Sequence, residues 1–311
     1  MRKAVAAVAV LLVSAIPSPA HAATLPVEHN CQNHNGSLNE ASGLAMSRKF
    51  PKIAYTLNDT VGQHPVVYAI YVQDCTLKGV YEVNAPNFPD TISDIDTEAI
   101  SVSSNGTIWI ADTGDNTGAR HDVSLFSFPE PSKLTGANTT TTIERYSRYF
   151  VSYDGGGHVD VESLLVPPNG GLPSLVSKTA LGTNGAVYGF KAPLQASSSS
   201  SCKSTADPQD SECVFNVAYK TSRSVPGGVS DATYTPDSRY VLIRRKDDQI
   251  SAFRTSSWPW PYVSTWATPD LMQPESLTVS LLAPLHSKTV DVWVGSEGSP
   301  SPFQELSVPL S

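Results

Sequence analysis

One pattern recurs along this chain: an acidic residue, a short apolar segment, a turn, and a second apolar segment that ends in a polar or charged residue. The acidic residues are spaced roughly 45 to 70 residues apart. Similar units of this length generally stack side by side, because one unit cannot bury its apolar face alone. The paired residues are Glu40 with Asn58, Glu98 with Asp112, Glu162 with Lys178, Asp231 with Arg244 and Arg245, and Glu275 with Glu297.

The apolar segments are typical of β-strands, because they are short, alternate in polarity and are rich in β-branched and aromatic residues. No window of about ten residues keeps the apolar period of a helix. The chain is also interrupted by 24 prolines and 20 glycines. Strands are predicted over 53–57, 66–72, 107–111, 124–128, 149–152, 186–190, 240–244 and 290–295.

Many short strands separated by turns are typical of a sandwich, a barrel or a propeller. The repeat decides among these folds, because its length is that of one propeller blade with its loops. We therefore predict an all-β fold, a single β-propeller domain over residues 23–311. Five blades are predicted, with six as the alternative.

The composition excludes some partners. Charged residues make up 16% of the chain and the net charge is −8, with no basic stripe of the kind that binds a nucleic-acid backbone. The 40% of apolar residues are enough to form a core. We expect a monomer that binds no nucleic acid.

The first 22 residues are typical of a secretory signal peptide. Arg2 and Lys3 precede an apolar run over 4–16, and Ala20-His21-Ala22 forms an A-x-A cleavage site. The run is shorter than the roughly 20 residues that span a bilayer, so we expect cleavage after Ala22, a secreted extracellular protein and no membrane span.

Export favours disulfides for the four cysteines, an even number. The predicted pairs are local, Cys31 with Cys75 and Cys202 with Cys213. Metal binding by these cysteines is the weaker alternative, because the chain has no C-x-x-C spacing.

The repeat predicts a shared axial site. The innermost strand of each propeller blade lines the central channel, so a polar residue repeated in every blade lies on a ring around the axis. The alternative is that each acid only caps a turn. Clustered acids raise one another's pKa or need a cation. That cation is either a basic side chain (Lys178, Arg244 or Arg245, Arg120) or a bound calcium ion. The predicted oxygen ligands for calcium are Asp59, Asp96, Asp115 and Asn116.

Several motifs carry a family resemblance. The segments D-I-D-T-E-A-I over 94–100 and I-A-D-T-G-D-N over 110–116, followed by Arg120, resemble a bacterial family of secreted or lipid-anchored β-propellers. Members of that family carry D-W-E-D-I, then D-x-G-D-N and a nearby arginine; Thr97 stands here where they have tryptophan. The chain is more distantly similar to phytase-type and lactonase-type propellers. The resemblance implies the fold and the positions of the site, and it does not imply a reaction.

Two functions fit these residues. The first is an extracellular hydrolase, either a glycosidase with paired carboxylates or a metal-dependent esterase or phosphoesterase. The second is a non-catalytic module that binds a carbohydrate, a cation or a protein. In both, a small molecule or glycan would occupy the central channel. The predicted catalytic residues are Glu98, Glu162, Asp112, Glu275 and Arg120. The predicted substrate contacts are Asn58, Lys178, Asp231, Arg244, Glu297 and His158.

Overall fold

The computed structural model describes residues 22–59, 64–84, 95–120, 123–197, 214–257, 259–281 and 288–310. All regular secondary structure in these ranges is β-strand, as predicted. None of the described segments forms a helix long and apolar enough to cross a membrane. Residues 1–21 of the predicted signal peptide, and both Cys202 and Cys213, lie outside the described residues.

The described strands form four sheets. The first contains β2 (Ala41–Met46), β3 (Ile53–Asn58), β4 (Val66–Tyr71), β5 (Thr76–Val83) and, parallel to β5, β9 (Thr140–Ile143). The second has eight strands: β6 (Thr97–Val102), β7 (Thr107–Asp112), β8 (Val123–Pro129), β10 (Ser147–Tyr153), β14 (Phe215–Pro226), β13 (Asn184–Gly189), β12 (Ser174–Ser177) and β11 (Val161–Leu165). Its two halves are joined by the parallel pair β10 and β14.

The third sheet contains β15 (Val229–Tyr234), β16 (Tyr240–Arg245), β17 (Gln249–Arg254) and β18 (Tyr262–Ala267). The fourth contains β19 (Pro274–Val279), β20 (Thr289–Ser296), β21 (Ser301–Pro309) and β1 (Val27–Asn33). Within this sheet β1 pairs antiparallel with β21. Segments from the two ends of the chain therefore share one sheet.

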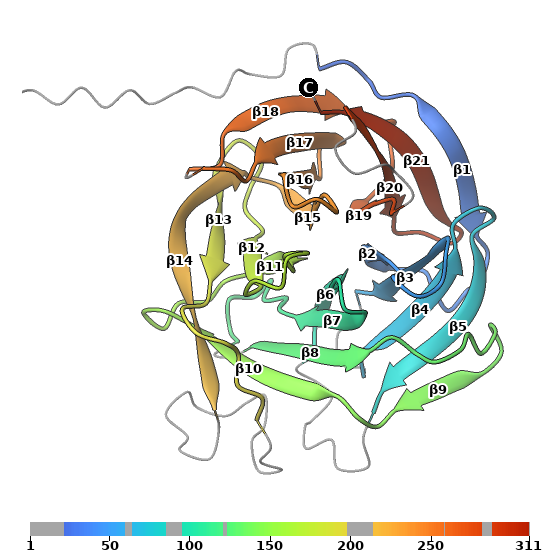
Figure 1. The fold of residues 1–311 in the computed structure, drawn as a ribbon, viewed down its shortest axis with the longest axis horizontal. Helices are drawn as coiled ribbons and strands as arrows, with labels where there is room; N and C mark the ends of the chain where they lie inside the picture. Colours follow the sequence, from blue (N-terminus) through green and yellow to red (C-terminus); the bar gives the residue numbers. More distant parts are fainter. Residues whose placement is uncertain are drawn as a thin grey trace, which may run out of the picture.

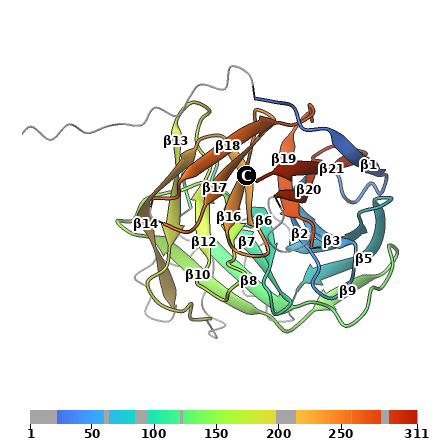
Figure 2. The same cartoon turned by 45° about the horizontal axis from the view of Figure 1, so that its top comes forward.

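The strands β2, β6, β11, β15 and β19 lie in a ring around one axis, and each contacts the next (Figure 1). From each of them the remaining strands of its sheet extend outward (Figure 1). The tilted view in Figure 2 also shows this for β2, β6 and β19. This radial arrangement of sheets is that of a β-propeller. The sheet topology therefore confirms the predicted propeller class.

The apolar core lies between neighbouring sheets. One cluster joins the first sheet to β6, β7 and β8 through Tyr55, Tyr81, Ile110 and Phe126, all fully buried. Such burial is the main stabilising contribution, at about 25 cal/mol per Å² of apolar surface. The apolar side chains therefore lie between the sheets, and polar side chains lie near the axis.

A cavity of about 30 Å³ lies at the ends of the inner strands, among residues that include Leu44, Ile100, Ala232 and Val279. That volume holds about one water molecule.

A disulfide links Cys31 on β1 to Cys75 in the turn between β4 and β5, with a Cα–Cα distance of 5.6 Å. This confirms the first predicted pair. It joins the fourth sheet covalently to the first across the ring closure.

Candidate functional site

A β-bulge marks the start of four inner strands. In β6, Thr97 pairs with Asp112 and Ala99 with Ala111, which leaves Glu98 in the bulge. Glu162 in β11 and Glu275 in β19 occupy the same position. Bulges re-aim side chains at the rims of such sheets. The three glutamates are therefore structurally equivalent.

The fourth bulge differs from the repeat seen in the sequence. In β15 the bulged residue is Ser230, and Asp231 lies one residue further along the strand. On β2 the register shift falls between Ser42 and Ala45, and Glu40 precedes the strand, which begins at Ala41. Three of the five repeated acids are thus in register and two are not.

A second set of equivalent residues directly follows the strand next to four of the five inner strands. Their backbone N–H groups donate to the carbonyl oxygen of the residue just before the inner strand, at 2.8 Å for Asp59, Lys178 and Lys246 and at 3.2 Å for Glu297. These bonds fix four side chains at the same level of the ring. The equivalent residues are Asp59 rather than Asn58, and Lys246 rather than Arg244 or Arg245.

We call Glu162, Glu275, Lys178 and Lys246 the lysine side of the ring. Lys178 Nζ forms an ion pair with Glu162 Oε1. Lys246 Nζ lies 3.6 Å from the same oxygen and 3.1 Å from Glu275 Oε1. Each carboxylate on this side therefore has a cationic partner.

Burial and the neighbouring charges oppose each other in setting the pKa values of the lysine side. Burial raises the pKa of Glu162, although Lys246 and Lys178 lower it. Burial and the neighbouring Glu162 raise the pKa of Glu275 to about 7. Burial lowers the pKa of Lys178, but the adjacent Glu162 and Asp160 raise it by more, so this ammonium stays charged.

Lys178 has two further oxygen neighbours. Its Nζ donates to Asn116 Oδ1 at 3.1 Å and lies 3.6 Å from Asp160 Oδ2. Asp160 in turn accepts the backbone N–H of Asp115 at 3.0 Å. The ammonium group is therefore surrounded by carboxylate and amide oxygens.

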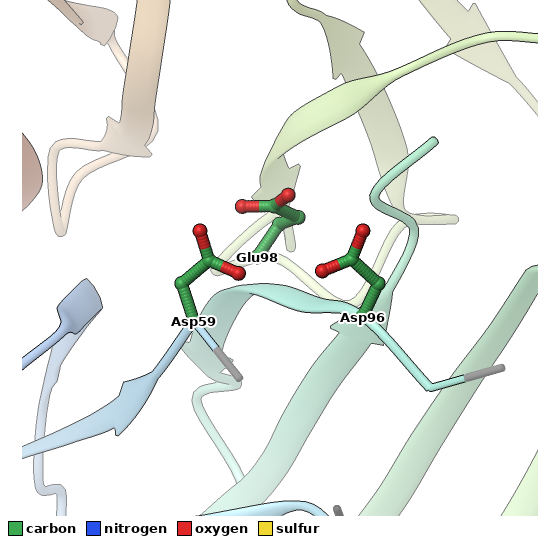
Figure 3. Close-up of side chains that lie close together, drawn as sticks. All are labelled: Asp59, Asp96 and Glu98. Atoms are coloured by element: carbon green, nitrogen blue, oxygen red, sulfur yellow. The ribbon is translucent and has the colours of Figure 1, made fainter. Parts of the chain in front are cut away.

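We call Asp59, Asp96 and Glu98 the acid side (Figure 3). One carboxylate oxygen from each lies within 4.8 Å of the other two. Glu98 is only 1% exposed, and its Oε1 has no hydrogen-bond partner among the described residues; the same holds for Asp96 Oδ1. No described lysine or arginine forms an ion pair with these three carboxylates. Arg120 and Lys178 act on Asp96 and Glu98 only from beyond ion-pair distance.

The pKa values of the acid side reflect this crowding. Burial, Asp96 and Glu162 raise the pKa of Asp59 to about 7, and Asp59 shares a hydrogen bond with Asp96. Burial raises the pKa of Asp96 despite the opposing effect of Arg120. Burial, Glu162 and Asp59 hold the pKa of Glu98 well above its ordinary value. A shared hydrogen bond between two carboxyl groups requires a proton on one of them.

Gly114 makes room for the acid side. A Cβ atom at this position would lie against Asp96 Oδ2 and 2.5 Å from Glu98 Oε1, closer than atoms pack. Its N–H donates to the backbone oxygen of Asp96 at 3.1 Å. The glycine in D-T-G-D-N is therefore explained by the close approach of two carboxylates.

The loop after β7 is ordered by its own charged residues. Arg120 Nη1 lies 2.9 Å from Asp112 Oδ1, which also accepts the backbone N–H of Asp96 at 2.8 Å. Asp115 Oδ1 accepts the backbone N–H groups of Ala119 and Arg120 at 2.8 and 3.1 Å. Asp112, Arg120 and Asp115 thus position the acid side, and none of them belongs to its group of three oxygens.

His158 lies at the exposed rim of this loop. Its Nδ1 is 2.7 Å from the backbone oxygen of Arg120 and 3.6 Å from Asp115 Oδ2. It contacts the loop that positions the acid side.

Asp231 lies one residue further along its inner strand than the bulge position. It is 2% exposed. Its Oδ1 accepts the N–H of Ala232 and its Oδ2 that of Leu277, both at 2.7 Å. A third bond comes from the backbone of Leu44. Asp231 therefore ties together β15, β19 and β2.

Arg244, Asn58 and Glu297 also have defined protein partners. Arg244 is fully buried, donates to Thr268 Oγ1 at 2.8 Å and pairs with Asp248 at 3.2 Å. Asn58 Nδ2 donates to the backbone oxygen of Ser37 at 2.7 Å, which holds the loop before β2. Glu297 is half-buried in the ring and accepts a hydrogen bond from Gln273 Nε2.

Sequence reasoning missed three contributors: Lys246, Asp160 and Gly114. Asp160-Val161-Glu162 repeats the D-x-E spacing of Asp96-Thr97-Glu98. That shorter motif would have identified Asp160. Lys246 is the last of three consecutive basic residues, so composition alone could not single it out.

Comparison with known proteins leaves the family open. No protein-family model matches the chain, and no curated protein matches it. Among solved structures, it is similar to the WD40 domain of Toxoplasma gondii coronin, with a TM-score of 0.44 and 11% sequence identity over 94% of this chain and 89% of that one. The fold assignment therefore rests on the sheet topology.

Proposed function

We propose that this protein is a secreted, five-bladed β-propeller that binds a hard divalent cation, such as calcium, at its axis. The count of five follows if the eight-stranded sheet is taken as two blades joined by β10 and β14, one blade for each inner strand. Secretion is supported by the N-terminal sequence.

The acid side carries this proposal. Three crowded carboxylates, two of them with buried oxygens that lack hydrogen-bond partners, are costly unless a proton or a cation lies among them. Calcium takes six to eight oxygen ligands and favours carboxylates. Asp59, Asp96 and Glu98 would supply three of these ligands, and water or a bound molecule the others. The ion would replace the proton shared by Asp59 and Asp96.

We propose that the main role of the ion is to bind a ligand. The acid side lies where β6 begins, and an ion there would keep positions for oxygen atoms of a small molecule or glycan. Lys178 and Lys246 are both about one-third exposed beside it. The protein would then act as a cation-dependent binding module.

Hydrolysis is the second candidate, favoured by one observation. Carboxylate oxygens of Glu98 and Glu162 lie within 4.8 Å of each other. Retaining glycosidases place their two carboxyl groups at about 5 Å, and the raised pKa of Glu98 suits a general acid. A panel of glycoside and ester substrates, assayed with and without EDTA, separates this candidate from the binding module.

Calorimetric titration with calcium after chelation tests the cation site. We expect one ion per chain for the wild type and at least roughly tenfold weaker binding for Glu98→Gln, because a ligand oxygen is lost. Glu28→Gln, which removes an exposed carboxylate on β1, is the control and should bind as the wild type does. Absence of binding heat together with an unchanged melting temperature in saturating calcium, magnesium and manganese would overturn the proposal.

A further inference from the structure

We infer that the ring has two cation positions that share Glu98, and that the ammonium group of Lys178 permanently occupies the second. The protein therefore takes a single divalent cation, and removal of Lys178 opens a position for another. This inference rests on the proposed function for the first position, which is the acid side. The second position is defined by Glu98, Asp160 and Glu162.

The geometry supports two adjoining positions. Oxygens of Glu98, Asp160 and Glu162 lie within 4.8 Å of one another, just as those of Asp59, Asp96 and Glu98 do. Glu98 is the only member of both groups, and it is almost fully buried. A carboxylate between two cation positions is a common arrangement in sites that hold two metal ions close together.

The surroundings of Lys178 are those of a hard cation. Its three neighbours are Glu162 Oε1, Asn116 Oδ1 at 3.1 Å and Asp160 Oδ2 at 3.6 Å. Carboxylate and amide oxygens are the ligands that calcium prefers. The ammonium group thus lies where the protein supplies a set of oxygen donors.

Backbone contacts hold Lys178 in place. Its N–H donates to the carbonyl oxygen of Asp160 at 2.8 Å, so the side chain starts beside one of its own partners. A tethered charge cannot dissociate, and it neutralises Glu162 with one positive charge instead of two. Two divalent ions at adjoining positions would repel each other more strongly.

Loss of the ammonium group removes one positive charge from the second position. In Lys178→Met, Lys246 would remain 3.6 Å from Glu162, whereas Asp160 and Asn116 would lose their cation. Uncompensated buried charge is costly, so the position would take up a proton or a metal ion. Above neutral pH, with calcium present, we expect the metal ion.

The experiment counts the ions bound per chain at pH 8 by calorimetry with calcium, and by electron paramagnetic resonance with manganese. We expect one ion for the wild type and two for K178M, with magnetic coupling between the two manganese ions. Lys220→Met, an exposed lysine on β14, is the control for removal of a charge elsewhere and should bind one ion. Folding is checked by circular dichroism.

The outcomes separate the two proposals. A folded K178M that binds one ion overturns the second position, while the first stands. A wild type that binds no ion overturns the cation site and this inference with it. If K178M folds only when calcium is added, the position is supported. If it does not fold at all, Lys178→Gln replaces it, and a single ion in that variant overturns the inference.

Discussion

The acid side and the lysine side of the ring are built from the same elements but neutralised differently. Each contains a D-x-E segment at the start of an inner strand, 96–98 in β6 and 160–162 in β11. Lys178 follows β12, the strand paired with β11, and its N–H donates to Asp160, whereas Asp59 follows β3 in the neighbouring blade and its N–H donates to Glu40. The two side chains thus approach their D-x-E segments from different blades, and their opposite charges decide whether the protein supplies the positive charge itself.

The largest expected effect on calcium binding comes from placing a lysine on the acid side as well. Asp59→Lys places an ammonium group next to Asp96 and Glu98, where it would occupy the cation position. We expect calcium binding to weaken roughly a hundredfold or more. The melting temperature in EDTA should rise because repulsion between carboxylates is relieved. Calorimetry and thermal unfolding measure both effects. Glu28→Lys is the control, and undiminished calcium binding by D59K would contradict the comparison.

A second substitution disturbs only the acid side. Gly114→Ala forces a methyl group against Asp96 and Glu98, and overpacking of this kind costs about 1–3 kcal/mol. We expect a loss of stability of that size in urea unfolding, together with weaker calcium binding. Gly157→Ala is the matched control, since a Cβ there meets nothing within 4 Å. Equal behaviour of the two variants would show that the carboxylates do not need the space at Gly114.

The raised pKa of Asp59 predicts that the stability of the metal-free protein depends on pH. The pKa of Asp59 is raised to about 7 from 3.8, so the folded protein without metal holds a proton that the unfolded chain releases. The resulting stability is full below the unfolded pKa and is lost as pH rises through about 7. The melting temperature in EDTA should therefore fall between pH 5 and about 8, and calcium should reduce that fall. A melting temperature in EDTA that rises over this range would show that Asp59 does not hold this proton in the folded protein.

The smallest effect is expected on the lysine side. Lys246→Met removes one of the two cationic partners of Glu162 and the ammonium group beside Glu275. Lys246 is about one-third exposed, Glu162 keeps Lys178, and Glu275, whose pKa is already about 7, can take up a proton. We therefore expect a loss of only about 1 kcal/mol in unfolding free energy. Urea unfolding at pH 8 measures it. A loss several times larger would mean that Lys246, and not Lys178, is the main cation of this side.

The fold was predictable from sequence because the short alternating strands and the repeat agree with each other. The register was not, because a bulge adds one residue and shifts every side chain after it. Asp231 looked equivalent to Glu162 along the chain, yet Ser230 takes that position in β15. The separation of a lysine side from an acid side depends on which blades are neighbours, and that arises only when the ring closes.

The pairing of β1 with β21 imposes an order on how the molecule is assembled. Strand β1 leaves the ribosome early, but its hydrogen-bonding partner follows more than about 260 residues later, so the strand must wait with an open edge of the kind that promotes aggregation. The bond between Cys31 and Cys75 spans a short stretch of chain and can form long before that partner exists. An oxidising compartment would therefore keep β1 beside the nascent first sheet until the circle is completed, and in a reducing one the same strand would be left unanchored.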